Sequence, residues 1–376
     1  MAGFDVAVVG LGAMGSAALF NLARRGLKVV GIERFQPGHD RGSSHGESRA
    51  IRLGYFEHPS YVPLVRAAYD RWAELERLTG ETVLTKTGVL EMGKPGSIIV
   101  NGSIEASQQH GIPHEVLDAG EVRRRFPQFT LPDDYAAVWQ ADGGFVRPEF
   151  ANRLYLDLAR SAGAEARFGV KVHAIDSRPG SVTVVTDHGP VEARSVIVSS
   201  GAWISDLVPA LKPKLTIARQ VLCWFEPKRA DVVALGRLPV FIVDGPDDIA
   251  YGFPNLGAGF KCASHYDSGV LDHADAARQG AGPADEKRMR DFLDAYLPDA
   301  AGKLLGMKTC MYTKTPDEDF VIDRLPADPR IVVCSACSGH GYKFASVIGE
   351  VLADVATAGE TRHDISRFAL SRFGSI

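Results

Sequence analysis

A thiol in a polar setting is the first feature of this sequence that points to chemistry. Cys310 lies within TCMYTKTPDEDF, residues 309–320, between Lys308 and Lys314. Most free cysteines in proteins behave as small buried hydrophobes, whereas a nearby cation lowers the pKa of a thiol and favours the nucleophilic thiolate. On these residues alone, Cys310 is a candidate for packing, for ligand binding, for nucleophilic attack or for covalent attachment of another group.

Two pairs of basic residues are placed to bind an anion. Arg49 and Arg52 close RGSSHGESRAIR, and their spacing puts them on one face of a helix or one side of a turn. Either guanidinium suits the fork geometry of a carboxylate, with a solvated basic turn as the alternative. Lys261 and His265, in GFKCASH, would point to the same face of a strand. The apolar neighbours of Lys261 indicate a partly buried functional ammonium, with a snorkelling surface lysine as the alternative.

A glycine-rich turn near the C-terminus carries a further cation. In SGHGYKFASVIGE, His340 stands between Gly339 and Gly341. Lys343 follows in the first turn of a predicted helix, where a cation opposes the helix dipole at a cost of up to about 1 kcal/mol. Lys343 is therefore either a mildly unfavourable helix cap or the partner of an anion, such as a carboxylate or an electron-rich ring.

The N-terminal residues predict a nucleotide site. Residues 4–9 predict a buried strand, and residues 28–33 predict a second strand that ends at Glu33. Between them a helix opens on the motif glycines Gly10, Gly12 and Gly15. These glycines allow a tight turn and close approach of the backbone to a pyrophosphate, which the helix N-terminus also favours. Because Glu33 is placed to bind ribose hydroxyls, the unit predicts an adenine dinucleotide, either NAD or FAD.

The rest of the pattern predicts two interleaved domains. We expect helices over 61–79, 145–163 and about 284–297, strands over 86–93, 165–203 and 216–312, and a closing strand, glycine turn and long helix from 330. A return to β structure beside the nucleotide suits FAD enzymes. The expected fold class is α/β, with a Rossmann-type, glutathione-reductase-like FAD-binding domain and an interleaved α+β substrate domain built on an antiparallel sheet. The first would comprise residues 1–85, 145–215 and 320–376, and the second residues 86–144 and 216–319.

Composition narrows the class of protein. The chain has 376 residues and a formal net charge of −4, which gives no global attraction to nucleic acid. Its five cysteines are scattered and odd in number, so we expect a reducing compartment rather than disulfides. Cys334 and Cys337 have CxxC spacing without a second pair, so we expect two buried strand cysteines and no metal site. With neither a secretion signal nor a run of about 20 apolar residues, we expect a cytoplasmic protein without a membrane partner.

Six ordered motifs give the sequence a specific family resemblance. It resembles the monomeric sarcosine oxidase and N-methyltryptophan oxidase family, which are amine oxidases with covalent FAD. The motifs are GLGAMG (10–15), GSSHGESRAIR (42–52), YGFP (251–254), GFKCASH (259–265), CMYTKTPDEDFVID (310–323) and SGHGYKFASVIGE (338–350). They occur in the order of the family and at near-family spacing, along almost the whole chain.

The resemblance implies a role for each candidate residue. FAD would be held by a thioether from Cys310 to the methyl group on the benzenoid ring of the flavin. Arg52 and Lys343 would bind the substrate carboxylate, and Lys261 would lie at the central ring of the flavin and promote its reaction with dioxygen. The other catalytic residues would be His265, Arg49, Tyr251, Tyr312 and His340. The cofactor-binding residues would be Gly10, Gly12, Gly15, Glu33, Ser43, His45, Ser48, Val172, Gly201, Gly339 and Gly341.

The resemblance also implies an activity. We expect a monomer that oxidises an N-methyl amino acid, such as sarcosine or N-methyl-L-tryptophan, with dioxygen to the demethylated amino acid, formaldehyde and hydrogen peroxide. An oxidase of a cyclic imino acid such as pipecolate or proline is the alternative within the family, and a redox-silent flavin-binding protein is the alternative from another class. An enzyme that passes electrons to a protein acceptor is disfavoured by Lys261, and an NAD-dependent dehydrogenase leaves the Cys310 segment without a purpose.

The sequence departs from the family pattern at four places that bear on the substrate side chain. Ser48 stands in place of threonine, and Leu53-Gly54 stands in place of His-Ala next to Arg52. YFEHPSYVP, residues 55–63, replaces a YGEG-type loop, and SSGAW replaces CAGAW.

Overall fold

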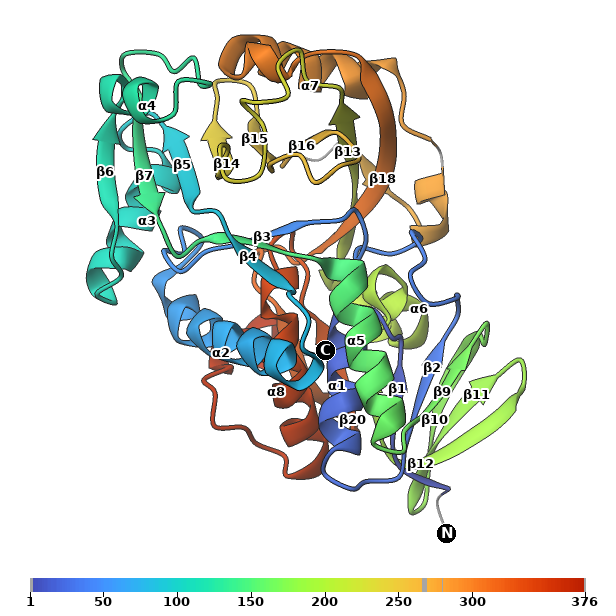
Figure 1. Ribbon diagram of the computed structural model, residues 1–376. Coiled ribbons are helices and arrows are strands. Elements are labelled where there is room, and N and C mark those ends of the chain that lie inside the picture. The colour runs from blue at the N-terminus through green and yellow to red at the C-terminus, as the bar shows by residue number, and fades with distance from the viewer. Residues whose placement is uncertain (1–2, 266–268, 279, 375–376) are drawn as a thin grey trace.

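Two large β-sheets and a small sheet between them form the computed structural model, which describes residues 3–265, 269–278 and 280–374. Figure 1 shows one large sheet with its helices in the lower half of the molecule and the other in the upper half. The small sheet consists of β3 (Arg49–Ile51), β8 (Gly144–Val146) and β4 (Leu84–Lys86), in that order.

The first sheet contains the predicted nucleotide unit. Its strands run in the order β10-β11-β12-β1-β2-β9, with β20 beside β12 and β19 beside β20. The pairs of β1 with β2 and β12, of β2 with β9 and of β12 with β20 are parallel, whereas β10, β11 and β19 pair antiparallel. The bounds are β1 (Phe4–Val9), β2 (Val29–Glu33), β9 (Glu165–Phe168), β10 (Val172–Arg178), β11 (Ser181–Thr186), β12 (Gly189–Val198), β19 (Val321–Leu325) and β20 (Asp328–Ser335).

Both faces of strand β1 are buried, and successive side chains along it point to opposite faces. Val6 and Val8 join the core formed with the helices, while Ala7 and Val9 join a second core with the β11 side chains. Because a core covers each face, the strand is an uninterrupted apolar run in the sequence. The helices of the first core are α1 (Ala13–Ala23), α2 (Val62–Thr79), α5 (Pro148–Ser161) and α8 (Ala345–Thr357).

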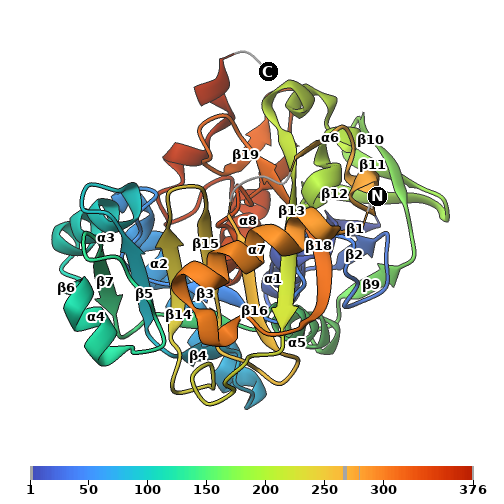
Figure 2. The same cartoon turned by 90° about the horizontal axis from the view of Figure 1, so that it is seen from above.

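The second sheet is antiparallel except where β14 pairs with β5. Its order is β17-β13-β16-β15-β14-β5-β7-β6, with β18 beside β13. Figure 2 shows α7 (Pro283–Tyr296) across this sheet. The strands are β5 (Val89–Gly93), β6 (Glu115–Asp118), β7 (Ala136–Gln140), β13 (Thr216–Phe225), β14 (Val240–Asp244), β15 (Ile249–Gly252), β16 (Phe260–Ser264), β17 (Val270–Leu271) and β18 (Leu304–Lys314).

The expected fold class is confirmed, since a Rossmann-type sheet and a mainly antiparallel sheet are both present. The division of the chain at the expected domain boundaries stays a prediction. The sequence patterns missed the helices α3 (Ile98–Gln109), α4 (Ala119–Arg125) and α6 (Ile204–Leu207). A capping signal was available for the first two, because Ser97 accepts a hydrogen bond from the backbone of Val100 and Asp118 accepts one from that of Glu121.

Two predictions of local structure are wrong. Arg49 lies in β3 and Arg52 follows that strand, so the two arginines share no helical face. In a strand, residues three apart point to opposite sides, and the two guanidinium groups have different partners. Lys343 lies in a single 3-10 turn, Tyr342–Phe344, before α8 begins at Ala345, so it is not in the first turn of that helix.

Candidate active site

Residues from both large sheets line a cavity of about 950 Å³. The structure brings most of the predicted site residues to its wall. They are Gly10, Gly12, Glu33, Ser43, Arg49, Arg52, Val172, Gly201, Tyr251, His265, Tyr312, Gly339, His340, Gly341 and Lys343. The other predicted residues do not line the cavity, and they are Gly15, His45, Ser48, Lys261 and Cys310. Lys261 and Cys310 instead contact residues at or next to the wall, as described below.

The turn between β1 and α1 is built for close approach to a ligand. Gly10 has a φ of +90°, and a Cβ there would lie 2.7 Å from the Ser199 carbonyl oxygen. A Cβ at Gly15 would lie within 2 Å of the Gly10 carbonyl oxygen, so this helix can pack on its strand only with glycine there. The N-terminus of α1 consequently opens at the cavity, where its dipole favours a phosphate.

Glu33 lies at the end of β2 and fixes this turn. Its carboxylate accepts hydrogen bonds from the backbone N–H of Leu11 at 2.8 Å and of Phe35 at 3.0 Å. A carboxylate has about four acceptor sites, so ribose hydroxyls can also bind it from the cavity. The predicted ribose ligand is therefore also the residue that holds the glycine turn in place.

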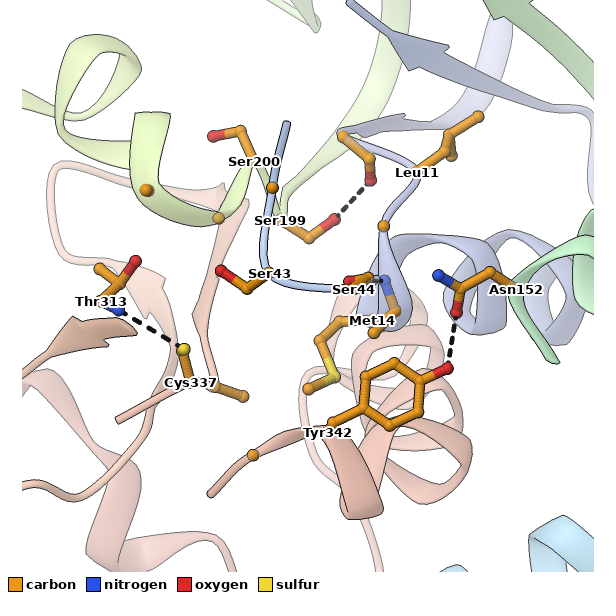
Figure 3. A pocket seen from close by; sticks show the side chains of 18 of the residues that line it. Leu11, Met14, Ser43, Ser44, Asn152, Ser199, Ser200, Thr313, Cys337 and Tyr342 are labelled. Carbon is orange, nitrogen blue, oxygen red and sulfur yellow. Dashed lines mark hydrogen bonds between the residues drawn. The ribbon is translucent and has the colours of Figure 1, made fainter. Parts of the chain in front are cut away.

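Unpaired polar groups in and beside the cavity test whether the residues fit FAD. Within the described part of the chain, the hydroxyls of Ser200 and Thr313 and both ring nitrogens of buried His45 have no hydrogen-bond partner. Figure 3 shows Ser200, Ser43 and Thr313 around the same space. Burial, reinforced by Arg49, lowers the pKa of His45 to about 4, which leaves a neutral imidazole able to donate and accept. Because buried polar groups are normally paired, the cavity fits a large polar dinucleotide.

The Cys310 thiol is buried against a guanidinium. Arg49 Nη2 lies 3.7 Å from its sulfur and also donates a hydrogen bond of 3.0 Å to the Ser43 carbonyl. Burial would lower the pKa of Arg49, but Cys310 and other neighbours raise it overall, so the guanidinium stays charged. The prediction that Lys308 and Lys314 are the cations beside this thiol is wrong, because Lys308 is exposed and Lys314 pairs with Glu318. Arg49 takes that place.

Lys261 is buried, with a relative exposure of 2%, so the alternative of a snorkelling surface lysine is wrong. Its Nζ donates hydrogen bonds to the carbonyls of Gly46 at 2.6 Å and Ser48 at 2.8 Å, and it lies 4.5 Å from the ring centroid of Phe253. Burial and then Arg49 lower the pKa of Lys261 well below its usual value. Since Phe253 and Arg49 line the cavity, Lys261 stands one side chain behind its wall.

Arg52 binds two carboxylates. Its Nη2 lies 2.6 Å from Glu57 and its Nε lies 2.5 Å from Glu91. Although burial raises the pKa of Glu57, Arg52 more than offsets this and lowers it to about 2. Burial prevails at Glu91 and raises its pKa to about 7. Glu57 is therefore the acid that neutralises Arg52 at neutral pH, and Glu91 titrates there.

Lys343 is the second cation at this end of the cavity. Its Nζ donates a hydrogen bond of 2.7 Å to the His340 carbonyl and lies 3.5 Å from the Tyr55 hydroxyl. Burial and then Arg52 lower the pKa of Lys343 to about 7. The His340 ring bridges the Tyr55 hydroxyl at 2.5 Å and the Glu318 carbonyl at 3.0 Å, and burial lowers its pKa to about 4. His340 is therefore neutral and held in one orientation.

Aromatic residues of the second sheet complete the wall. The hydroxyls of Tyr251 and Tyr312 lie 3.4 Å apart, and the rings of His265 and Tyr312 have their centroids 5.7 Å apart. Burial raises the pKa of both tyrosines and lowers that of His265, so all three are neutral near pH 7. They shape this part of the cavity without adding charge.

Sequence reasoning missed three residues of the site. Glu57 carried no signal, while Glu91 stands out only as an acid inside the buried run VLEMG. The prediction of two buried strand cysteines holds for Cys334 but is wrong for Cys337, which lies beyond β20 and lines the cavity. Its sulfur accepts a hydrogen bond of 3.4 Å from the backbone of Thr313, as Figure 3 shows.

Comparisons with known proteins identify the family. The family model described as FAD dependent oxidoreductase matches residues 5–355. Monomeric sarcosine oxidase from Bacillus sp. (strain B-0618) is 39% identical over 374 residues, which cover 98% of this chain and 96% of that protein. N-methyl-L-tryptophan oxidase from Yersinia pestis (strain Pestoides F) is 37% identical over 373 residues, which cover 98% of this chain and 99% of that protein.

Solved structures share the fold over nearly the whole chain. NikD, described as an unusual amino acid oxidase essential for nikkomycin biosynthesis, has a TM-score of 0.87 at 26% identity and covers 98% of each chain. L-proline dehydrogenase from P. horikoshii has a TM-score of 0.85 at 20% identity and covers 99% of this chain and 98% of its own. Within the described residues, no helix combines the length and apolarity needed to cross a bilayer. The resemblance drawn from the six motifs is confirmed, and the chain belongs to the FAD-dependent oxidoreductase family.

Proposed function

We propose that this chain is a flavin-dependent oxidase of N-methyl amino acids, of the sarcosine or N-methyl-L-tryptophan type. One observation carries the proposal: two cations lie close to the same ring beside the cavity. Arg52 Cζ lies 4.9 Å and Lys343 Nζ 5.1 Å from the centroid of the Tyr55 ring. Such a pair suits the carboxylate of an amino acid. The full-length likeness to two oxidases named for N-methylated amino acids supports the substrate class.

The proposed reaction divides the work between cofactor and protein. When bound, FAD would supply the redox chemistry, which moves two electrons from the substrate to dioxygen. Overall, the N-methyl amino acid, dioxygen and water give the demethylated amino acid, formaldehyde and hydrogen peroxide, which balances atoms and electrons. Arg52 and Lys343 hold the carboxylate and so orient the methylated nitrogen. His265, Tyr251 and Tyr312 form a neutral wall that excludes water, and orientation of this kind supplies a large part of a rate enhancement.

The proposal includes covalent FAD at Cys310. Joining the Cys310 sulfur to the flavin methyl carbon removes one hydrogen from each and two electrons overall, and dioxygen is the oxidant that finally accepts them. Arg49 Nη2 lies 3.7 Å from the sulfur, so a positive charge stands beside the proposed attachment point. Buried His45, which has no hydrogen-bond partner in the described part of the chain, and Ser43, Ser48 and Val172 belong to the proposed cofactor-binding set. A monomer in the cytoplasm also stays a prediction.

The substrate class can be tested by a screen with two products. The purified yellow protein is given sarcosine, N-methyl-L-tryptophan, L-pipecolate or L-proline in air, and hydrogen peroxide and formaldehyde are measured. We expect peroxide and formaldehyde in equal amounts from an N-methyl amino acid, because its methyl carbon is the one oxidised. Peroxide without formaldehyde from a cyclic substrate would replace the proposal by an imino acid oxidase, and no peroxide from any of the four would remove the oxidase function.

The carboxylate site predicts how anion binding depends on pH. Above about pH 7, Lys343 loses its positive charge, which disfavours an anion. We expect the dissociation constant of acetate to rise by up to about tenfold per pH unit there, since each pKa unit is about 1.4 kcal/mol. The titration is followed by the visible absorption of the bound flavin, with neutral acetamide as the control ligand.

The variant Lys343→Met tests this assignment in the same titration. It should bind acetate more weakly at about pH 6 and lose the rise of the dissociation constant above pH 7, because the ammonium that titrates there is gone. Acetate binding that is independent of pH between about 6 and 9 would remove Lys343 from the carboxylate site.

A further inference from the structure

Glu91 is a buried acid that the proposed reaction does not use. It lies in β5 of the second sheet, with 0% of its surface exposed. Its Oε2 accepts hydrogen bonds from Ser103 at 2.5 Å and from Gln140 at 2.9 Å, while its Oε1 faces Arg52 Nε at 2.5 Å. Ser103 of α3 and Gln140 of β7 therefore hold the Glu91 carboxylate against the Nε edge of the Arg52 guanidinium.

The same network fixes the chain next to Arg52. Gln140 accepts a hydrogen bond of 2.7 Å from the backbone of Gly54. A Cβ at Gly54 would lie 2.5 Å from Gln140 Nε2 and 2.6 Å from Ser107 Oγ, so a side chain there would displace the network. The departure Leu53-Gly54, in place of His-Ala, thus belongs to the same arrangement as Glu91. Glycine at this position makes room for the residues that hold the acid.

Two acids leave one end of the guanidinium for a ligand. Glu57 accepts a hydrogen bond from Nη2, and Glu91 Oε1 lies 2.5 Å from Nε as an ion pair without hydrogen-bond geometry, whereas Nη1 contacts neither acid in the part of the chain that the structure describes. Phe56 stacks 4.1 Å from Cζ, which restrains the plane of the group. Arg52 lines the cavity, but Glu91 does not. Glu57 and Phe56 line the cavity too, so Glu91 is the one of these three groups that holds the guanidinium from behind the wall.

A second acid that acted only by its charge would weaken the site for a carboxylate, because it adds repulsion and a desolvation cost. An acid that restrains the orientation of the guanidinium has the opposite effect and strengthens carboxylate binding. A guanidinium held at two edges has few orientations to lose on binding, so its remaining donor is already in place. Glu91 and Gln140 of the second sheet and Ser103 of α3 maintain this hold, and all three side chains are buried.

We propose that Glu91 is a positioning residue, which anchors Arg52 by its Nε edge and thereby directs its free Nη1 toward the substrate carboxylate. The inference rests on the proposed function, because it takes Arg52 to be the carboxylate ligand. It assigns to the second sheet a part in substrate selection: amino acids that retain a free carboxylate are favoured over their amides and esters by the anchored guanidinium.

The test compares Glu91→Gln with wild type in binding acetate and neutral acetamide, followed by flavin absorption at about pH 8, where Glu91 is ionised. Glutamine keeps the shape and the hydrogen bonds of the network but removes the ion pair. We expect the preference for acetate over acetamide to fall about tenfold, with the spectrum of the free protein unchanged. With an active substrate, KM should rise while kcat changes little. Glu91→Asp, which keeps the charge, should lose less.

The results distinguish a positioning role of Glu91 from a merely repulsive one. Unchanged or tighter acetate binding by Glu91→Gln would overturn the positioning role, since tighter binding is what a merely repulsive charge predicts. Glu105→Gln, on the exposed side of α3, is the matched control for loss of an acid and should behave as wild type. Arg52→Ala tests the premise separately: if it also leaves the acetate preference intact, the proposed carboxylate site fails rather than the role of Glu91.

A less disruptive substitution tests the proposal if Glu91→Gln does not fold. Ser103→Ala removes one hydrogen bond to Glu91 and nothing at the cavity wall, since Ser103 does not line it. We expect the acetate preference to fall about threefold, as for the loss of one hydrogen bond. An unchanged preference in a folded Ser103→Ala protein would contradict the proposal.

Discussion

The variant Lys261→Met is expected to bind flavin and to be reduced by substrate, but to be reoxidised by dioxygen at least about a hundredfold more slowly, the usual effect of removing a preorganised charge. The physical reason is the position of the amine. Lys261 is held by the carbonyls of Gly46 and Ser48 directly behind Phe253 and Arg49, which line the cavity. The charge of Lys261 would act at the place where electrons pass to dioxygen. The carboxylate site around Arg52 is built from other residues, so reduction by the substrate should persist.

The measurement separates the two half-reactions. The protein is reduced anaerobically with a substrate from the screen, and the rate of reduction is compared with the rate at which aerated buffer restores the yellow colour. Lys287→Met, which removes an exposed lysine on α7, is the control for loss of a cation. A normal rate of reoxidation in Lys261→Met would remove Lys261 from its assigned role, and slowed reduction with normal reoxidation would place it among the substrate ligands.

The variant Cys310→Ala is expected to lose covalent flavin completely. After acid precipitation, wild type should keep its yellow colour in the pellet, whereas Cys310→Ala should release it to the supernatant, because no other bond survives unfolding. Wild-type protein should also carry flavin fluorescence through a denaturing gel. Release of the flavin from the wild type would leave Cys310 as a packing residue, in the small cluster with Leu222, Trp224 and Ala263.

A second thiol makes this test specific. Cys337 lines the cavity and is half-buried, yet burial raises the pKa of its thiol and it bonds to the Thr313 backbone. Cys337→Ala should therefore keep its colour in the pellet. If this variant instead releases the flavin, the attachment point lies on the glycine-rich turn after β20 rather than on β18.

Local patterns were sufficient for the nucleotide unit. The strand β1, the three motif glycines and Glu33 are close in sequence, and their roles follow from turn geometry and the helix dipole, which involve only neighbouring residues. The same holds for the burial of Lys261, which its apolar neighbours indicated. The ordered motifs, in turn, were sufficient to recognise the family.

Partners distant in the chain could not be predicted in this way. The guanidinium beside Cys310 belongs to Arg49, 261 residues away, although two lysines flank the thiol in the sequence. Lys308 and Lys314 share the strand face of Cys310, but Lys308 is exposed and Lys314 pairs with Glu318. The pairing of β18 with β13 and the path of the 42–48 loop decided the contact with Arg49. The prediction of a helical face for Arg49 and Arg52 failed for the same reason.

The sequence by itself determined the dinucleotide turn, the presence of Cys310, Lys261, Arg52 and Lys343, and the family. The tertiary structure decided what surrounds them: Glu57 and Glu91 at Arg52, the loop carbonyls at Lys261, and the Tyr55 ring close to both Arg52 and Lys343. Local propensity acts over a few residues, whereas the charge, burial and orientation of a side chain depend on whichever segments the two sheets bring together. Those contacts, and with them the direction of Arg52, exist only in the folded chain.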